Sequence, residues 1–159
     1  MKPSSIVVVA LGSNLGRSRT VLTEAFRRLR QLSAFGFQRS SVWQTAPVDC
    51  PPGSPDFLNA VVVFEPQPRE TPESLLNKLQ DLEREFGRQP KKVLNEARPL
   101  DLDLILFGSE RRNTPTLCLP HPRAMLRAFV LGPLCELAPE LIFPGKRLSV
   151  HEVFERLGR

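Results

Sequence analysis

The sequence predicts an α+β sandwich, in which helices pack on one β-sheet in the order β-α-β-β-α-β and a C-terminal extension follows. Two observations predict it. Short runs rich in β-branched residues are separated by two segments whose apolar residues recur at helical spacing. The 159 residues are 41% apolar and 25% charged, which suits one globular domain over residues 1–159.

The first strand and the first helix are expected within residues 6–32. Ile6 to Leu11 is a continuous apolar run of the kind that forms a buried strand. The glycine-rich segment 12–16 predicts a tight turn, because it lacks the lysine and the glycine spacing of a phosphate-binding loop. An amphipathic helix follows, with an apolar stripe made of Val21, Leu22, Ala25, Phe26, Leu29 and Leu32.

Two more strands and the second helix come next. Phe37 to Thr45 and Phe57 to Glu65 are the predicted strands. In the second helix Thr71 can cap the start, Pro72 fits the first helical position, and Gly87 stands where a terminal glycine belongs. Its apolar stripe consists of Leu75, Leu76, Leu79, Leu82 and Phe86.

The last strand of the core is expected at about residues 100–107. The C-terminal extension is irregular, with short helices near residues 128–137 and 150–157. The complete order is the split βαβ arrangement of a ferredoxin-like sandwich. Because this fold hosts many unrelated functions, the function has to be argued from candidate site residues.

The composition favours a cytoplasmic protein that binds an anionic partner. No apolar run approaches the ~20 residues needed to cross a bilayer, and the first residues show no signal-peptide layout. The three cysteines match no zinc or redox pattern, so we expect reduced thiols. A net charge of +5 suits nucleic acid, an anionic surface or a nucleoside triphosphate.

A pair of aspartates in the last strand is the strongest chemical signal. Asp101 and Asp103 alternate with leucines, so both carboxylates should project from one face of the strand. Hard oxygen ligands of this kind suit Mg²⁺, which commonly takes one or two carboxylates together with substrate phosphates. A bare Asp-x-Asp pattern would equally fit an ordinary strand with one face in solvent.

Cations near the aspartates favour the metal interpretation. Arg88 follows the second helix, Arg98 precedes the last strand, and His121 and Arg127 lie further along the chain. Arginine binds phosphate oxygens through two parallel hydrogen bonds, and a metal neutralises the remaining charge. The combination is typical of a site for nucleotide phosphoryl transfer.

Taken together, these motifs resemble the 6-hydroxymethyl-7,8-dihydropterin pyrophosphokinase family over nearly the whole chain. The matching segments, in chain order, are Ala10 to Gly16, Thr45 to Val48, Asp56 to Ala60, Leu82-Glu83 with Gly87-Arg88, Arg98 to Gly108, Leu119 to Arg123, Arg127 with Phe129, and Leu137 to Glu140. The combination of Arg-x-Leu-Asp-Leu-Asp with a downstream Pro-His is specific, whereas any single segment would be weak.

The resemblance implies an enzyme of folate synthesis, a transferase that moves pyrophosphate from ATP to the pterin and releases AMP. It implies two Mg²⁺ ions on Asp101 and Asp103, with these two residues and Arg88 and Arg98 as the catalytic residues. For ATP it implies contacts from Arg88, Arg98, Leu104, His121 and Arg127. For the pterin it implies Thr45, Pro47, Val48, Phe57, Asn59 and Phe129, where the two phenylalanines would stack on the ring and Asn59 would bond its edge.

One segment departs from the family pattern. Asn95 stands where many relatives carry a tryptophan that covers the nucleotide, and Pro90 stands where an arginine often occurs. This departure bears on how the loop holds ATP. Two alternatives to the enzyme are a noncatalytic pterin- or nucleotide-binding relative and a basic RNA-binding module. The sequence lacks the glycine-aromatic signature of the latter, so we expect no binding to nucleic acid. We also expect no membrane partner, and the resemblance to the family implies a monomer.

Overall fold

The computed structural model describes residues 6–14, 18–46, 52–53, 56–87 and 100–158. Its largest sheet is antiparallel and has the strand order β2-β4-β1-β5, with β3 paired to one end of β4. The strands are β1 (Val7–Ser13), β2 (Ser33–Arg39), β3 (Trp43–Thr45), β4 (Phe57–Pro66) and β5 (Asp101–Phe107). This order confirms the ferredoxin-like sandwich.

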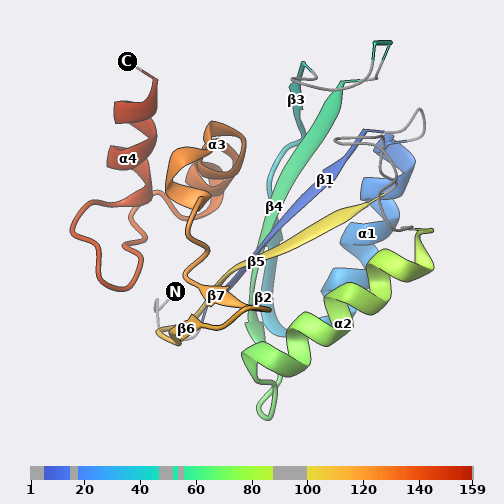
Figure 1. Ribbon diagram of the computed structural model, residues 1–159, viewed down its shortest axis with the longest axis horizontal. Coiled ribbons are helices and arrows are strands. Elements are labelled where there is room, and N and C mark those ends of the chain that lie inside the picture. The colour runs from blue at the N-terminus through green and yellow to red at the C-terminus, as the bar shows by residue number, and fades with distance from the viewer. Residues whose placement is uncertain (1–5, 15–17, 47–51, 54–55, 88–99, 159) are drawn as a thin grey trace.

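Helices cover both faces of the sheet (Figure 1). The helices α1 (Ser18–Leu32) and α2 (Pro72–Glu85) lie on one face, and α3 (Ala128–Leu137) and α4 (Val150–Leu157) lie on the other. The bounds of α3 and α4 agree with the prediction for the C-terminal extension. None of the helices in the described part of the chain is long and apolar enough to cross a membrane.

The alternation of side chains along the strands divides the interior into two apolar clusters. Leu11, Leu102 and Leu104 pack in the cluster under α1 and α2. Ala10 and Val61 belong to the cluster under α3 and α4. Asp101 and Asp103 alternate with the leucines of β5 and share one face of the strand, as the sequence predicted; that face is the one on the α3 side of the sheet.

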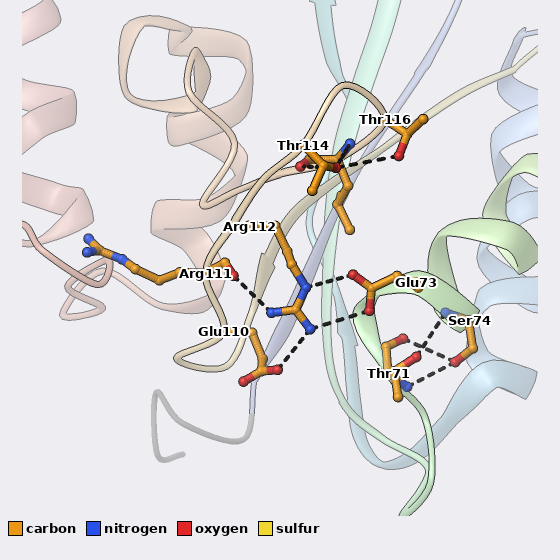
Figure 2. A network of polar contacts seen from close by, with 9 residues as sticks. Thr71, Glu73, Ser74, Glu110, Arg111, Arg112, Thr114 and Thr116 are labelled. Atoms are coloured by element: carbon orange, nitrogen blue, oxygen red, sulfur yellow. Dashed lines mark hydrogen bonds and ion pairs between the residues drawn. The ribbon is translucent and has the colours of Figure 1, made fainter.

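The second helix begins and ends as its sequence indicates. The Thr71 hydroxyl accepts a hydrogen bond from the backbone N–H of Ser74, whose own hydroxyl accepts one from the N–H of Thr71. Gly87 has a positive φ of 88°, which glycine adopts without strain. Figure 2 shows this cap beside Glu73, which pairs with Arg112 at 2.6 Å.

The sequence did not predict the small hairpin that contains Arg112. It consists of β6 (Arg112–Asn113) and β7 (Cys118–Leu119), and a short 3₁₀ turn at Ala124–Leu126 leads from it into α3. Strands of two residues are too short to show a period of alternation. At the turn of the hairpin, the Thr114 hydroxyl donates a hydrogen bond to the carbonyl of Leu117 and accepts one from the N–H of the same residue.

The predicted strand Phe37 to Thr45 was wrong as one element, because the chain leaves the sheet between β2 and β3. The Ser40 hydroxyl accepts the N–H of Val61 at 2.9 Å, a bond that a continuous strand would make through its backbone. The next N–H, that of Ser41, donates to Glu136 of α3 at 2.8 Å. The backbone N–H of Ser40 still donates to the carbonyl of Val61 at 2.9 Å, but side chains make the neighbouring bonds, and regular pairing with β4 is interrupted between β2 and β3.

Candidate active site

Polar side chains gather where three neighbouring strands meet, on the face of the sheet covered by α3. In one row across the sheet, Asn59 of β4 lies opposite Gly12 of β1, which lies opposite Asp101 of β5. In the next row, Asp103 lies opposite Ala10. A Cβ atom at Gly12 would stand 3.4 Å from Asn59 Oδ1, so glycine keeps the space between the two polar side chains open.

A cavity of about 360 Å³ lies over these rows. Apolar and polar groups both line it, and all the described residues that the sequence assigned to the pterin are among them: Thr45, Phe57, Asn59 and Phe129. Asn59 is buried and its Nδ2 donates to Thr45 Oγ1 at 3.2 Å. Phe129 is 37% exposed and neither apolar cluster contains it or Phe57, so both rings are available to a ligand.

A second cavity, of about 490 Å³, lies on the other side of the two aspartates. Four residues that the sequence assigned to ATP or metal, Asp101, Asp103, His121 and Arg127, line it together with the predicted Leu104. The β6–β7 hairpin supplies much of the remaining wall through residues 114–118. Asp101, Asp103 and Arg127 line both cavities, so they stand where a ligand in one would meet a ligand in the other.

The two aspartates fit a magnesium site that phosphate oxygens complete. Both are partly exposed on one face of a strand, and Arg127 Nη1 lies 3.9 Å from Asp103 Oδ2. Within the described ranges, no group of three or more histidine, cysteine or acidic side chains could enclose a metal. Two carboxylates are still enough for Mg²⁺, because this ion usually keeps several water molecules and binds substrate phosphates.

The environment of His121 keeps its ring neutral. Burial lowers the pKa of His121, and the charges of Arg127 and Arg123 lower it further, against the opposing effect of Asp101. The backbone N–H of Arg123 donates to His121 Nδ1 at 3.2 Å, so the neutral ring carries its proton on Nε2. The N–H of His121 itself donates to the carbonyl of Ile105 in β5 at 2.8 Å and fixes the loop beside the aspartates.

Several predicted residues lie outside the described ranges: Pro47, Val48, Arg88, Arg98, Pro90 and Asn95. Sequence reasoning missed other residues that line the first cavity, among them Ala10, Ser13, Ala46 and Val130. Three of these four are apolar, and the Ser13 hydroxyl donates to Ser18, so none of them stands out in the sequence as a candidate ligand-binding residue. The register of β1 against β5 could have indicated Ala10, because it places that residue opposite Asp103.

Comparison with known proteins shows which family this chain is similar to. The family model described as 7,8-dihydro-6-hydroxymethylpterin-pyrophosphokinase matches residues 8–139. The 2-amino-4-hydroxy-6-hydroxymethyldihydropteridine pyrophosphokinase of Bacillus subtilis is 37% identical over 139 residues, covering 87% of this chain and 81% of that protein. The Folic acid synthesis protein fol1 of Pneumocystis carinii is 34% identical over 152 residues, covering 95% of this chain but only 20% of that protein.

The chain spans a third or less of the length of two plant relatives. It covers 33% and 28% of two folate synthesis bifunctional proteins of Arabidopsis thaliana. Among solved structures, an HPPK-DHPS protein in complex with substrates superposes with a TM-score of 0.71. It is 13% identical, and the match covers 98% of this chain and 43% of that chain. This likeness supports the fold.

Proposed function

The chain belongs to the 7,8-dihydro-6-hydroxymethylpterin-pyrophosphokinase family, and we propose that it transfers pyrophosphate from ATP to 6-hydroxymethyl-7,8-dihydropterin in folate synthesis. The observation that carries the proposal is the pair of cavities that meet at Asp101, Asp103 and Arg127. Transfer of a group between two substrates requires that their reacting atoms approach each other, which two adjoining cavities allow. We further propose that residues 1–159 act as one cytoplasmic domain and as a monomer.

The first cavity would hold the pterin. Phe57 and Phe129 both line it and would stack on the flat ring, which gains from contact with aromatic faces. The Asn59 amide offers a donor and an acceptor to the mixed edge of the pterin, and Thr45 orients that amide. The predicted Pro47 and Val48 would contribute from the segment after β3.

The second cavity would hold ATP, with the triphosphate directed at the aspartates. Leu104 and His121 line this cavity, and Arg127 would bind phosphate oxygens from the border between the cavities. The predicted Arg88 and Arg98 would add positive charge from the segment between α2 and β5. Asp101 and Asp103 would hold two Mg²⁺ ions, whose chemistry is to neutralise the charge on the transferring phosphates.

In the reaction, the hydroxymethyl oxygen of the pterin attacks the β-phosphorus of ATP. The bond between that phosphorus and the oxygen of the α-phosphate breaks, AMP leaves, and the hydroxyl proton passes to solvent. The protein contributes mainly by orienting the two substrates, which replaces an encounter in solution by a reaction within one complex. Arg127 stabilises the charge that develops beside Asp103.

The direct test is an assay of the purified chain with Mg-ATP and 6-hydroxymethyl-7,8-dihydropterin, with the products separated by chromatography. We expect AMP and pterin pyrophosphate in equal amounts. Formation of ADP would contradict transfer of pyrophosphate, and tight pterin binding without turnover would support the noncatalytic relative. The RNA-binding alternative is disfavoured by the fold, because helices of the described part of the chain pack on both faces of the sheet, on which bases would otherwise stack.

A second prediction concerns proton uptake by His121. Its pKa is low in the free protein because of burial and nearby arginines, and bound phosphates would favour the charged ring. Binding of Mg-ATP near pH 6.5 should therefore take up protons, and ATP affinity should rise as the pH falls toward that value. Calorimetry in two buffers of different ionisation enthalpy measures the uptake. If the His121→Gln variant took up the same number of protons on binding Mg-ATP, a group other than His121 would be the one that is protonated, and the prediction would be wrong.

A further inference from the structure

Helix α3 and strand β3 each contribute a wall to the first cavity. Phe129 lies in the first turn of α3, and Thr45 ends β3. β3 also runs beside the start of β4, where Trp43 pairs with Asn59 and Thr45 pairs with Phe57. A shift of β3 relative to α3 would therefore change the distance between the residues proposed to hold the pterin.

A single carboxylate connects the two walls. Glu136 of α3 accepts hydrogen bonds from the backbone N–H of Ser41 at 2.8 Å, from the Ser41 hydroxyl at 2.6 Å, and from Trp43 Nε1 at 2.7 Å. These donors lie more than 90 residues from Glu136 in the sequence and just before the cavity residues of β3. Burial opposes the charge of Glu136, but the bonds from Ser41 and Trp43 outweigh it and lower its pKa.

The indole ring of Trp43 packs directly on the backbone of α3. A Cβ atom at Gly132 would overlap this ring, so only glycine permits the contact. Phe154 of α4 meets the ring edge-on, with centroids 6.0 Å apart and an angle of 79°. The ring is therefore enclosed by two helices while its N–H reaches Glu136.

The helical period places this contact on the same side of α3 as the pterin cavity. Phe129, Gly132 and Glu136 are spaced i, i+3 and i+7, which puts them on one face of the helix. Pro133, inside the helix, has no N–H to donate to the carbonyl of Phe129. The first turn of α3, which carries Phe129, therefore lacks one helical hydrogen bond. The position of this turn depends correspondingly more on contacts with other elements.

We infer that Trp43 and Glu136 are positioning residues for the pterin, which hold the β3 wall and the α3 wall of its cavity at a fixed separation. The inference rests on the proposed function. We therefore expect substitutions at Trp43 or Glu136 to weaken pterin binding more than they weaken ATP binding. Neither residue lines a cavity itself, but the two elements that they join, β3 and α3, both line the first cavity. The second cavity is bounded mainly by β5, the hairpin and the loop that follows it.

The test measures dissociation constants by calorimetry for the pterin, in the presence of Mg²⁺ and a non-hydrolysable ATP analogue, and for that analogue alone. Glu136→Gln keeps the shape of the side chain but loses an acceptor. Trp43→Phe keeps an aromatic ring but loses the N–H, together with the outer edge of the indole that lies against Gly132. Each should weaken pterin binding by about tenfold and leave binding of the analogue within about twofold. Glu136→Gln disturbs all three bonds to the carboxylate, whereas Trp43→Phe removes one of them, so the double variant should bind the pterin about as weakly as Glu136→Gln alone.

Glu73→Gln is the matched control, because it also removes a carboxylate that joins two elements, α2 and the hairpin (Figure 2). Glu73 does not line the first cavity. The Glu73→Gln variant should bind the pterin as wild type does. A Glu136→Gln protein with a lower Tm but unchanged pterin affinity would overturn the inference and leave the proposed function intact. A wild-type protein that binds no pterin would overturn both.

Discussion

Replacing Asp101 or Asp103 with alanine should lower kcat by about 10³-fold, because each change removes a carboxylate from the point where the two cavities meet. A loss of several kcal/mol of charge stabilisation in the transition state corresponds to a factor of this size. Both side chains are partly exposed at the edge of the cavities, so we expect the variants to fold. Initial rates with Mg-ATP and the pterin, together with thermal melting curves, test the prediction.

Two further variants separate charge from shape and from general surface effects. Asp103→Asn keeps the volume of the side chain but removes the charge that faces Arg127, and it should be nearly as slow as the alanine variant. Asp81→Ala removes an exposed carboxylate of α2 that pairs with Arg84, away from both cavities, and should turn over normally. Near-normal kinetics in either Asp101→Ala or Asp103→Ala would contradict the two-aspartate site.

The parts of the fold that could be predicted are those determined by neighbours in the sequence. The helix α2 has its cap at Thr71, its proline at position 72 and its terminal glycine at position 87, and the structure confirms all three. The orientation of Asp101 and Asp103 follows equally from alternation along one strand. Periodicity and capping act over a few residues, so one sequence is enough to show them.

The parts that could not be predicted depend on residues distant in the sequence. The break between β2 and β3 arises where Ser41 bonds Glu136, 95 residues away. From the sequence alone, Gly132 is only a poor helix former. The structure gives a reason for the glycine, because the ring of Trp43 lies where a Cβ atom would be. No local pattern specifies which distant side chain will satisfy a given N–H.

The candidate site shows the same division. The resemblance to the family assigned residues to the pterin and to ATP; those that the structure describes line one or both of the two cavities, and their roles toward the two substrates stay predictions. The wall that the β6–β7 hairpin adds to the second cavity was missed, because Thr114, Thr116 and Cys118 match no chemical motif. Their roles toward a ligand remain predictions.

Replacing Asn59 with alanine should weaken pterin binding by about 10²-fold and leave ATP binding unchanged. The amide is buried in the first cavity, where it can offer both a donor and an acceptor to the pterin edge. Losing two such bonds, each contributing about 1 to 1.5 kcal/mol, corresponds to a change of this size. Calorimetric titration with the pterin and, separately, with an ATP analogue measures both affinities.

Two conservative variants make this prediction specific to hydrogen bonding. Asn59→Asp keeps the shape but replaces the donor with a negative charge in the same row as Asp101, so it should bind the pterin no better than the alanine variant. Thr45→Val removes the hydroxyl that accepts from Asn59 Nδ2 and leaves the amide in place, so its effect should be smaller, about fivefold. If Asn59→Ala bound the pterin as tightly as wild type, Asn59 would have no part in recognising it. A graded series would instead show that the amide reads the pterin edge and that Thr45 acts by orienting it.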